Sequence, residues 1–212
     1  NPSATNTPRP MPSLNTVARN AMWPPICATP DRNSSASTAS AVIDGGVINQ
    51  VNTSAPLNIW TIGTAQLTIS SAMNGGNGVT NGAISAVKAG AGTLVLSGTN
   101  NLSGATTVSG GSLKVTGAIA SSAVTVESGA SLGGTGTVGA LTVKSGATLT
   151  PGMSPGTLTV DGNLLLQTGS TTEIEVSPTV ADKIVVTGTA TLAGTLALIN
   201  TGGSYPEPKS YR

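Results

Sequence analysis

The sequence predicts an all-β protein folded as a parallel β-helix, and three observations lead to that prediction. Only 8% of the 212 residues are charged and 2% are aromatic, which leaves too few Leu, Glu, Lys and Arg for amphipathic helices. The mean hydropathy is positive, at +0.18, whereas disordered chains have low hydrophobicity. Short alternating apolar runs, separated by glycine, recur at a nearly constant spacing through the second half of the chain.

The spacing is clearest between residues 124 and 149. Residues 124–132 (VTVESGASL) align with residues 141–149 (LTVKSGATL) at an offset of 17. The same step leads to residues 158–160 (LTV), and 16 more lead to residues 174–176 (IEV). Such a repeat is typical of a solenoid, in which equivalent strands of successive coils pair in parallel about 4.8 Å apart. An antiparallel β-sandwich is the alternative fold, and it is disfavoured because a sandwich does not require equivalent strand faces to recur every 17 residues.

Alternation within each strand separates the side chains of the tube interior from those of the outer surface. The residues predicted to point inward are Leu94, Leu113, Val126, Val143, Val160, Val176 and Val186. The central residues of the same triplets are mostly polar and are predicted to face solvent: Val95, Lys114, Thr125, Thr142, Thr159 and Glu175.

Composition divides the chain into three parts. Residues 1–40 hold seven of the 13 prolines and have no strand or helix period, so we expect a Pro/Ser/Thr-rich linker that is disordered. Residues 41–204 are the predicted β-helix, with regular strands from about 42 to 200 and little α-helix. Residues 205–212 are expected to be a truncated C-terminal extension. The chain starts at Asn1 without an apolar leader, which suggests a fragment or a processed product.

Several classes of function are disfavoured by charge and cysteine content. The net charge is +1 with no polybasic cluster, which argues against nucleic acid and anionic membrane surfaces. No apolar run reaches the roughly 18 residues of a membrane helix. The single cysteine, Cys27, has no internal disulfide partner, and the lack of histidine excludes His/Cys metal sites.

Two glycine motifs resemble catalytic or cofactor signatures. Residues 152–156 (GMSPG) match the G-x-S-x-G of a hydrolase elbow, but Pro155 cannot donate the oxyanion N–H, and there is no histidine to act as base. Residues 134–139 (GTGTVG) match G-x-G-x-x-G with Asp161 near the distance of a ribose carboxylate, but a strand pattern follows where a dinucleotide site needs a helix. We interpret both motifs as coil corners.

Among the acidic residues, Glu173 and Glu175 share one strand face, as a glycosidase pair or calcium ligands would. Two carboxylates supply few of the six to eight oxygens that calcium prefers, so a solvated outer face is the favoured interpretation. The Thr-x-Thr pairs, such as Thr148 and Thr150, leave ice binding as a weak alternative, because they do not recur at one point of the repeat. No catalytic, cofactor-binding or metal-binding residue and no small-molecule substrate is predicted.

One segment carries a family resemblance. Residues 89–115 (AGAGTLVLSGTNNLSGATTVSGGSLKV) resemble the passenger-associated transport repeat of bacterial autotransporters, with Leu102 where Tyr or Thr is common. Residues 149–160 (LTPGMSPGTLTV) and 181–196 (ADKIVVTGTATLAGTL) are similar to two elements that follow in the family, and Tyr205 and Tyr211 suit its next segment. The resemblance covers residues 89–212 well, 41–88 loosely and 1–40 not at all.

The resemblance implies a right-handed β-helix that is secreted by type V secretion and displayed at the cell surface, anchored through an outer-membrane β-barrel translocator in the parent protein. We expect a non-enzymatic stalk that folds outside the cell and supports the secretion and display of upstream passenger sequence. One alternative is an adhesin or self-association module that binds host or neighbouring-cell surfaces, with a role in virulence. A weaker alternative is the stalk of an enzyme whose catalytic domain lies upstream. We also expect the last coil to fray or associate unless residues 205–211 fold over it.

Overall fold

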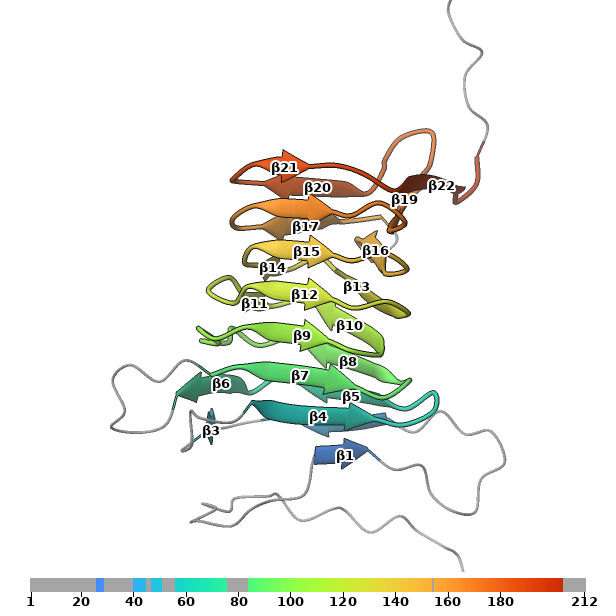
Figure 1. The fold of residues 1–212 in the computed structure, drawn as a ribbon. Helices are drawn as coiled ribbons and strands as arrows, with labels where there is room; N and C mark the ends of the chain where they lie inside the picture. The colour runs from blue at the N-terminus through green and yellow to red at the C-terminus, as the bar shows by residue number, and fades with distance from the viewer. Residues whose placement is uncertain are drawn as a thin grey trace, which may run out of the picture.

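The computed structural model describes residues 26–28, 40–44, 47–50, 56–75, 84–153 and 155–203. Within these ranges every helix or strand assigned is a β-strand, and the named strands pair only in parallel. The strands stack as a solenoid of about six turns, from β1 at the bottom of Figure 1 to β21 and β22 at its top. The predicted parallel β-helix is therefore confirmed.

Three long sheets run along the axis, and each takes one strand from successive coils. The first sheet contains β1 (Ile26–Ala28), β4 (Leu57–Thr61), β7 (Ala86–Ala89), β9 (Thr106–Val108), β12 (Val124–Val126), β15 (Leu141–Val143), β18 (Leu164–Leu166) and β21 (Ala190–Thr191). The second contains β2 (Ser40–Ile43), β5 (Gln66–Ile69), β8 (Thr93–Leu96), β10 (Gly111–Val115), β13 (Ala130–Gly134), β16 (Thr148–Pro151), β19 (Thr171–Val176) and β22 (Thr195–Asn200). The third contains β11 (Ala118–Ile119), β14 (Thr137–Val138), β17 (Thr157–Val160) and β20 (Lys183–Val186). A two-stranded sheet of β3 (Val47–Gln50) and β6 (Ala72–Gly75) completes the first coils.

The chain visits the sheets in a fixed order. From β11 onward each coil contributes one strand to the third, first and second sheets in turn, so these coils have three sides. In Figure 1 the strands of the first sheet point right at the front, and the chain returns behind them as it rises, which is the path of a right-handed coil.

Inward side chains form continuous rows along the axis. Leu67, Leu94, Leu113, Leu132 and Leu149 are neighbours in successive coils of the second sheet, and each is at most 2% exposed. Burying such a side chain stabilises the fold by about 1.5–3 kcal/mol, but only once the adjacent coil covers it. Five of the seven residues predicted to point inward are fully buried: Leu94, Leu113, Val126, Val143 and Val160.

The other two predicted inward residues lie near the C-terminal end. Val186 is partly buried, pairs with Val160 and packs against the core. Val176 is partly buried at the end of β19, where it pairs with Asn200. The 17-residue frame gives Val143, Val160 and Val176 equivalent positions, but their strands β15, β17 and β19 belong to the first, third and second sheets, so the three valines do not form one row.

The predicted 17-residue frame holds for one step and then fails. Leu141 does pair with Val124, 17 residues earlier, but its next partner is Leu164 rather than Leu158. Leu158 lies on β17 in the third sheet and pairs with Ile184. The coil between β15 and β18 is longer than 17 residues because it includes the corner after β16. All three sheets use the same apolar–polar–apolar triplet, so the local pattern does not show which sheet a triplet joins.

The N-terminal boundary of the solenoid lies earlier than the composition suggests. Strand β1 falls within the segment expected to be a linker, and Cys27 on it pairs with Trp60 of β4 in the parallel register. Most of residues 1–40 and all of 204–212, including Tyr205 and Tyr211, lie outside the described residues, so the predictions for these segments stay predictions.

Candidate functional site

The segment from β7 to β10 shows how one coil binds to the coil before it. The Asn100 side chain is buried in the loop after β8, and its Nδ2 atom donates to the carbonyl of Gly98 at 2.9 Å. Its Oδ1 atom accepts the backbone N–H of Met73, in the preceding coil, at 3.0 Å. An asparagine at this position therefore joins two coils and satisfies buried backbone groups at the same time.

Glycines in the same segment permit the coils to approach closely. A Cβ atom at Gly98 would lie 2.6 Å from the carbonyl oxygen of Ser70, and one at Gly104 would lie 2.7 Å from that of Ile84. Real Cβ atoms essentially never approach backbone oxygens so closely, so larger residues would force the coils apart. Together with Asn100, these glycines form the part of the repeat that fits one coil onto another.

Lys88 adds a buried cation to this coil, and no sequence motif marks it. The side chain is 1% exposed and occupies an inward position between Ile59 and Val108. Its Nζ atom donates to the carbonyls of Ala89, Gly90 and Gly110 at 3.1, 2.9 and 2.8 Å. Burial lowers the pKa of the Lys88 ammonium from 10.5 to about 8. The only sequence signal was a lysine at an inward position of an alternating strand.

Comparison with known protein families bears on this same segment. Residues 87–115 match the family described as passenger-associated-transport-repeat. The chain contains an autotransporter passenger repeat. The match runs from the second residue of β7 to the last residue of β10, and the repeat together with the solenoid fits an autotransporter passenger. No curated protein and no solved structure matches the chain.

The passenger repeat has two implications, one for the location of the chain and one for the parent protein. It implies a secreted domain exposed at the cell surface, and it suggests an outer-membrane translocator domain in the parent protein. In the part of the chain that the structure describes, no helix is long and apolar enough to cross a membrane.

The two glycine motifs form coil corners. Gly134 has φ +114°, and a Cβ atom there would collide with the carbonyl oxygen of Val115 in the preceding coil. The G-x-G-x-x-G run continues into β14 and then β15, as the strand pattern predicted. Gly152 has φ +91° and donates its N–H to the Gly134 carbonyl at 2.9 Å. Ser154 of the G-x-S-x-G motif lies outside the described residues.

Asp182 holds this second corner in place. Its Oδ1 atom accepts the N–H of Gly156 at 2.7 Å and its Oδ2 atom accepts the N–H of Glu175 at 2.9 Å. Its own N–H donates to the Glu175 carbonyl at 2.8 Å. Because Asp182 is only 9% exposed, these contacts are largely shielded from water and bind the corner to the end of β19.

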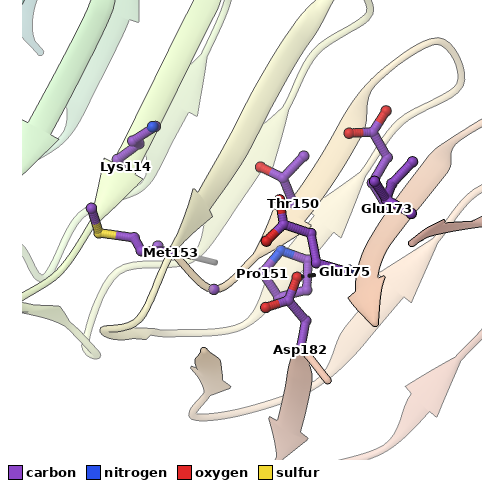
Figure 2. Close-up of a pocket in the computed structure, with 10 residues that line it drawn as sticks. Lys114, Thr150, Pro151, Met153, Glu173, Glu175 and Asp182 are labelled. Carbon is purple, nitrogen blue, oxygen red and sulfur yellow. Dashed lines mark hydrogen bonds between the residues drawn. The ribbon is translucent and has the colours of Figure 1, made fainter. Parts of the chain in front are cut away.

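An open groove of about 520 Å³ lies beside Asp182 on the outer face of the second sheet. Strands β16 and β19 pair only at Thr148–Thr171 and Leu149–Thr172, whereas β19 and β22 pair over six residues. The sheet therefore splits after Leu149. In Figure 2, Lys114 and Met153 lie on one side of the groove and Glu173 on the other, with Thr150, Glu175 and Asp182 between them.

Glu173 and Glu175 thus share a strand face, as predicted, but the face lines a groove instead of an open surface. Within the described ranges no group of three or more His, Cys, Asp or Glu side chains could hold a metal ion. Asp161, the other carboxylate considered, accepts the hydroxyl of Thr187 at 3.1 Å on the exposed surface.

The threonines follow a different arrangement from the one the sequence suggested. Thr148 belongs to an outward hydroxyl row that passes through successive coils of the second sheet: Thr93, Ser112, Ser131, Thr148, Thr171 and Thr195. The neighbouring outward row contains Val95, Lys114, Gly133 and Thr150, so no second hydroxyl row accompanies the first there. A flat double array of Thr-x-Thr pairs, as ice binding would need, is absent from these strands.

Proposed function

We propose that this chain is the β-helical stalk of an autotransporter passenger. In this role it folds at the cell surface as it emerges and supports the secretion and display of passenger sequence that precedes it. The observation that carries the proposal is the passenger repeat at residues 87–115, set within coils that each bond to their predecessor.

The contacts between coils supply the physical basis for ordered folding. Each strand of a new coil pairs in parallel with a strand edge whose amide and carbonyl groups have no hydrogen-bond partner until the new coil forms. The Asn100 side chain also bonds to the preceding coil, by accepting the backbone N–H of Met73. One coil alone leaves its apolar row in water, so added coils stabilise one another only when they stack. Folding outside the cell would therefore bias the chain against sliding back into the translocator.

The non-enzymatic part of the proposal rests on how the candidate groups are used. Asp182 bonds two backbone amides, and Gly134 and Gly152 serve as corners between coils. These roles account for the motif residues through the fold, without a reaction.

Surface display in a Gram-negative host tests the proposal. The full 212-residue chain is placed between an epitope tag and an outer-membrane translocator barrel, and tag exposure is measured by antibody binding to intact cells. We expect Val143→Asp, which puts a charge into the buried row, to lower surface tag several-fold. Thr142→Asp, one residue away on the outer face, should leave it close to the parent level.

The two variants must be produced in equal amounts, which immunoblots of whole cells determine. Equal surface tag for both variants, with Val143→Asp shown to be unfolded by circular dichroism, would contradict the proposed stalk function. Display would then not depend on a folded solenoid.

A further inference from the structure

We propose that the groove between β10 and β19 binds an extended peptide segment of a partner protein, with an arginine or lysine side chain at Glu175 and an acidic side chain at Lys114. This binding site goes beyond the stalk role, since stacking of the coils does not require it.

The groove exists because two strands separate. Pairing between β16 and β19 ends at Leu149–Thr172, and Asp182 instead occupies the edge of β19 by bonding to the N–H and carbonyl groups of Glu175. The split is therefore held open by a buried side chain, and does not need a ligand to form.

Among the described residues, no cation pairs with the acidic side of the groove. The Oε2 atom of Glu175 is buried and has no hydrogen-bond partner among the described residues. Both carboxylate oxygens of the adjacent Asp182 are already bonded to backbone amides. A guanidinium or ammonium group in the groove would balance the charge of the Glu175 carboxylate, which has no ion-pair partner among the described residues. A metal ion is disfavoured because no three-ligand group is present in the described part of the chain.

The opposite side of the groove carries a cation. Lys114 is exposed on β10, three strands away from Glu175 on β19, and the only ion pair within the described ranges joins Lys144 to Glu127 elsewhere on the surface. Three inter-strand steps separate the backbones of β10 and β19 by at least about 14 Å, and no ion pair joins Lys114 to Glu175 in the described part of the chain. The ligand therefore needs charges of both signs, held well apart.

The spacing and the surface between the charges favour a peptide. In an extended chain, residues i and i+4 lie about 13 Å apart and point to the same side. Lys114 and Lys88 are the two lysines of β7 and β10, but only Lys114 reaches the outer face. Met153 and Ile199 line the same groove and are 57% and 43% exposed, so they offer apolar contact to the stem of a long basic side chain.

Peptide binding to the full chain tests the proposal. The probe is a fluorescent acetyl-Arg-Ser-Thr-Ser-Asp amide, and a control peptide of the same composition has Arg and Asp adjacent. We expect saturable binding of the probe, measured by fluorescence anisotropy at low salt, and at least about tenfold weaker binding of the control. Glu175→Gln and Lys114→Met should each weaken probe binding by about tenfold, because each removes one charge partner.

Glu127→Gln serves as the matched control, since it removes a half-buried carboxylate that pairs with Lys144 outside the groove and should not change the affinity. Circular dichroism melts show whether each variant is folded, and a folded Glu175→Gln with unchanged affinity would overturn the proposal. Equal binding of the two peptides would also overturn it. If sedimentation instead shows that the chain dimerises and that Glu175→Gln separates the dimer, the occupant is a second copy and the peptide assignment is wrong.

Discussion

The Nζ atom of Lys88 lies 2.8 Å from the carbonyl oxygen of Gly110, one coil further along the solenoid. Lys88 stands in a row whose other members, including Ile59, Val108 and Val126, are aliphatic. The lysine thus replaces a hydrophobic contact with hydrogen bonds to three carbonyls at a corner. A buried charge of this kind is costly, and the cost should depend on pH.

The stability of the chain should rise with pH above about 8 because of Lys88. Burial lowers the pKa of its ammonium from 10.5 to about 8, so between these values the unfolded chain binds more protons than the folded chain. Below pH 8 both states are protonated, and this contribution is constant. We expect the free energy of unfolding to gain at most about 3 kcal/mol from pH 8 to 10.5.

Lys88→Met provides the comparison, since it keeps the length of the side chain and removes the titrating group. Urea denaturation of both proteins at several pH values measures the difference. A difference between wild type and Lys88→Met that stays flat from pH 7 to 10.5 would show that the folded-state pKa is not lowered.

The inward row of the first sheet should not tolerate charge. Val143 is fully buried between Val126 and Leu166, so Val143→Asp puts an unpaired carboxylate in the core. We expect a loss of at least about 3 kcal/mol in unfolding free energy. Thr142→Asp, on the outward side of the same strand, should change stability by less than about 0.5 kcal/mol. If the two variants melt alike, the assignment of inward and outward faces is wrong.

These rows show which aspects of the fold are readable from sequence. Alternation within a strand is a local property, so it correctly marks Val126 and Val143 as inward and Thr142 as outward. The assignment of a triplet to a sheet depends on the length of each corner. The corner between β16 and β17 adds residues that no local period reports, and Leu164 therefore takes the place predicted for Leu158.

The sequence does not predict the candidate groove, because the groove also depends on which strands lie side by side. Glu173 and Glu175 share a face by simple alternation, and that pair was identified correctly. Lys114 joins them only because β10, β13, β16 and β19 follow one another in the second sheet. The split that opens the groove depends on Asp182, whose two amide contacts come from separate parts of the chain.

Contact between coils should limit substitution at Gly134 more than at Gly129. Both have positive φ, +114° and +78°, so alanine at either position is strained by about 1–2 kcal/mol. A Cβ atom at Gly134 would also collide with the Val115 carbonyl, whereas one at Gly129 has nothing within 4 Å. We expect Gly134→Ala to cost at least about 3 kcal/mol and Gly129→Ala about 1 kcal/mol. Equal thermal midpoints for the two variants would mean that the coils separate easily at this corner.

Asp182 should stabilise the fold through its two amide contacts. Asp182→Ala leaves the N–H groups of Gly156 and Glu175 without acceptors, and we expect a loss of about 2–4 kcal/mol. Asp161→Ala is the matched control, since it removes only an exposed bond to Thr187 and should cost less than about 1 kcal/mol. Hydrogen exchange should accelerate at Gly156 and Glu175 in Asp182→Ala. Unchanged exchange at both amides would show that other groups hold this corner.

The C-terminal coil should be the least stable part of the described solenoid. Leu149 and Leu196 occupy the same inward row with Thr172 between them, yet Leu149 is fully buried and Leu196 is 63% exposed. Thr172 itself contributes a buried hydroxyl that has no hydrogen-bond partner among the described residues. We expect Leu149→Ala to cost about 2–5 kcal/mol and Leu196→Ala less than about 1 kcal/mol.

Hydrogen exchange measures the same decrease in local stability toward the C-terminal coil, without any substitution. Backbone amides of residues 195–198 lie on β22, which has a strand partner on one side only within the described residues, whereas β15 has partners on both. The amides of β22 should therefore exchange faster than those of Thr142 and Val143, through local opening rather than global unfolding. Sedimentation must first show that the chain is monomeric, since association would bury Leu196. Uniform protection from β15 to β22 in a monomer would mean that the last coil is covered, and Leu196→Ala should then cost as much as Leu149→Ala.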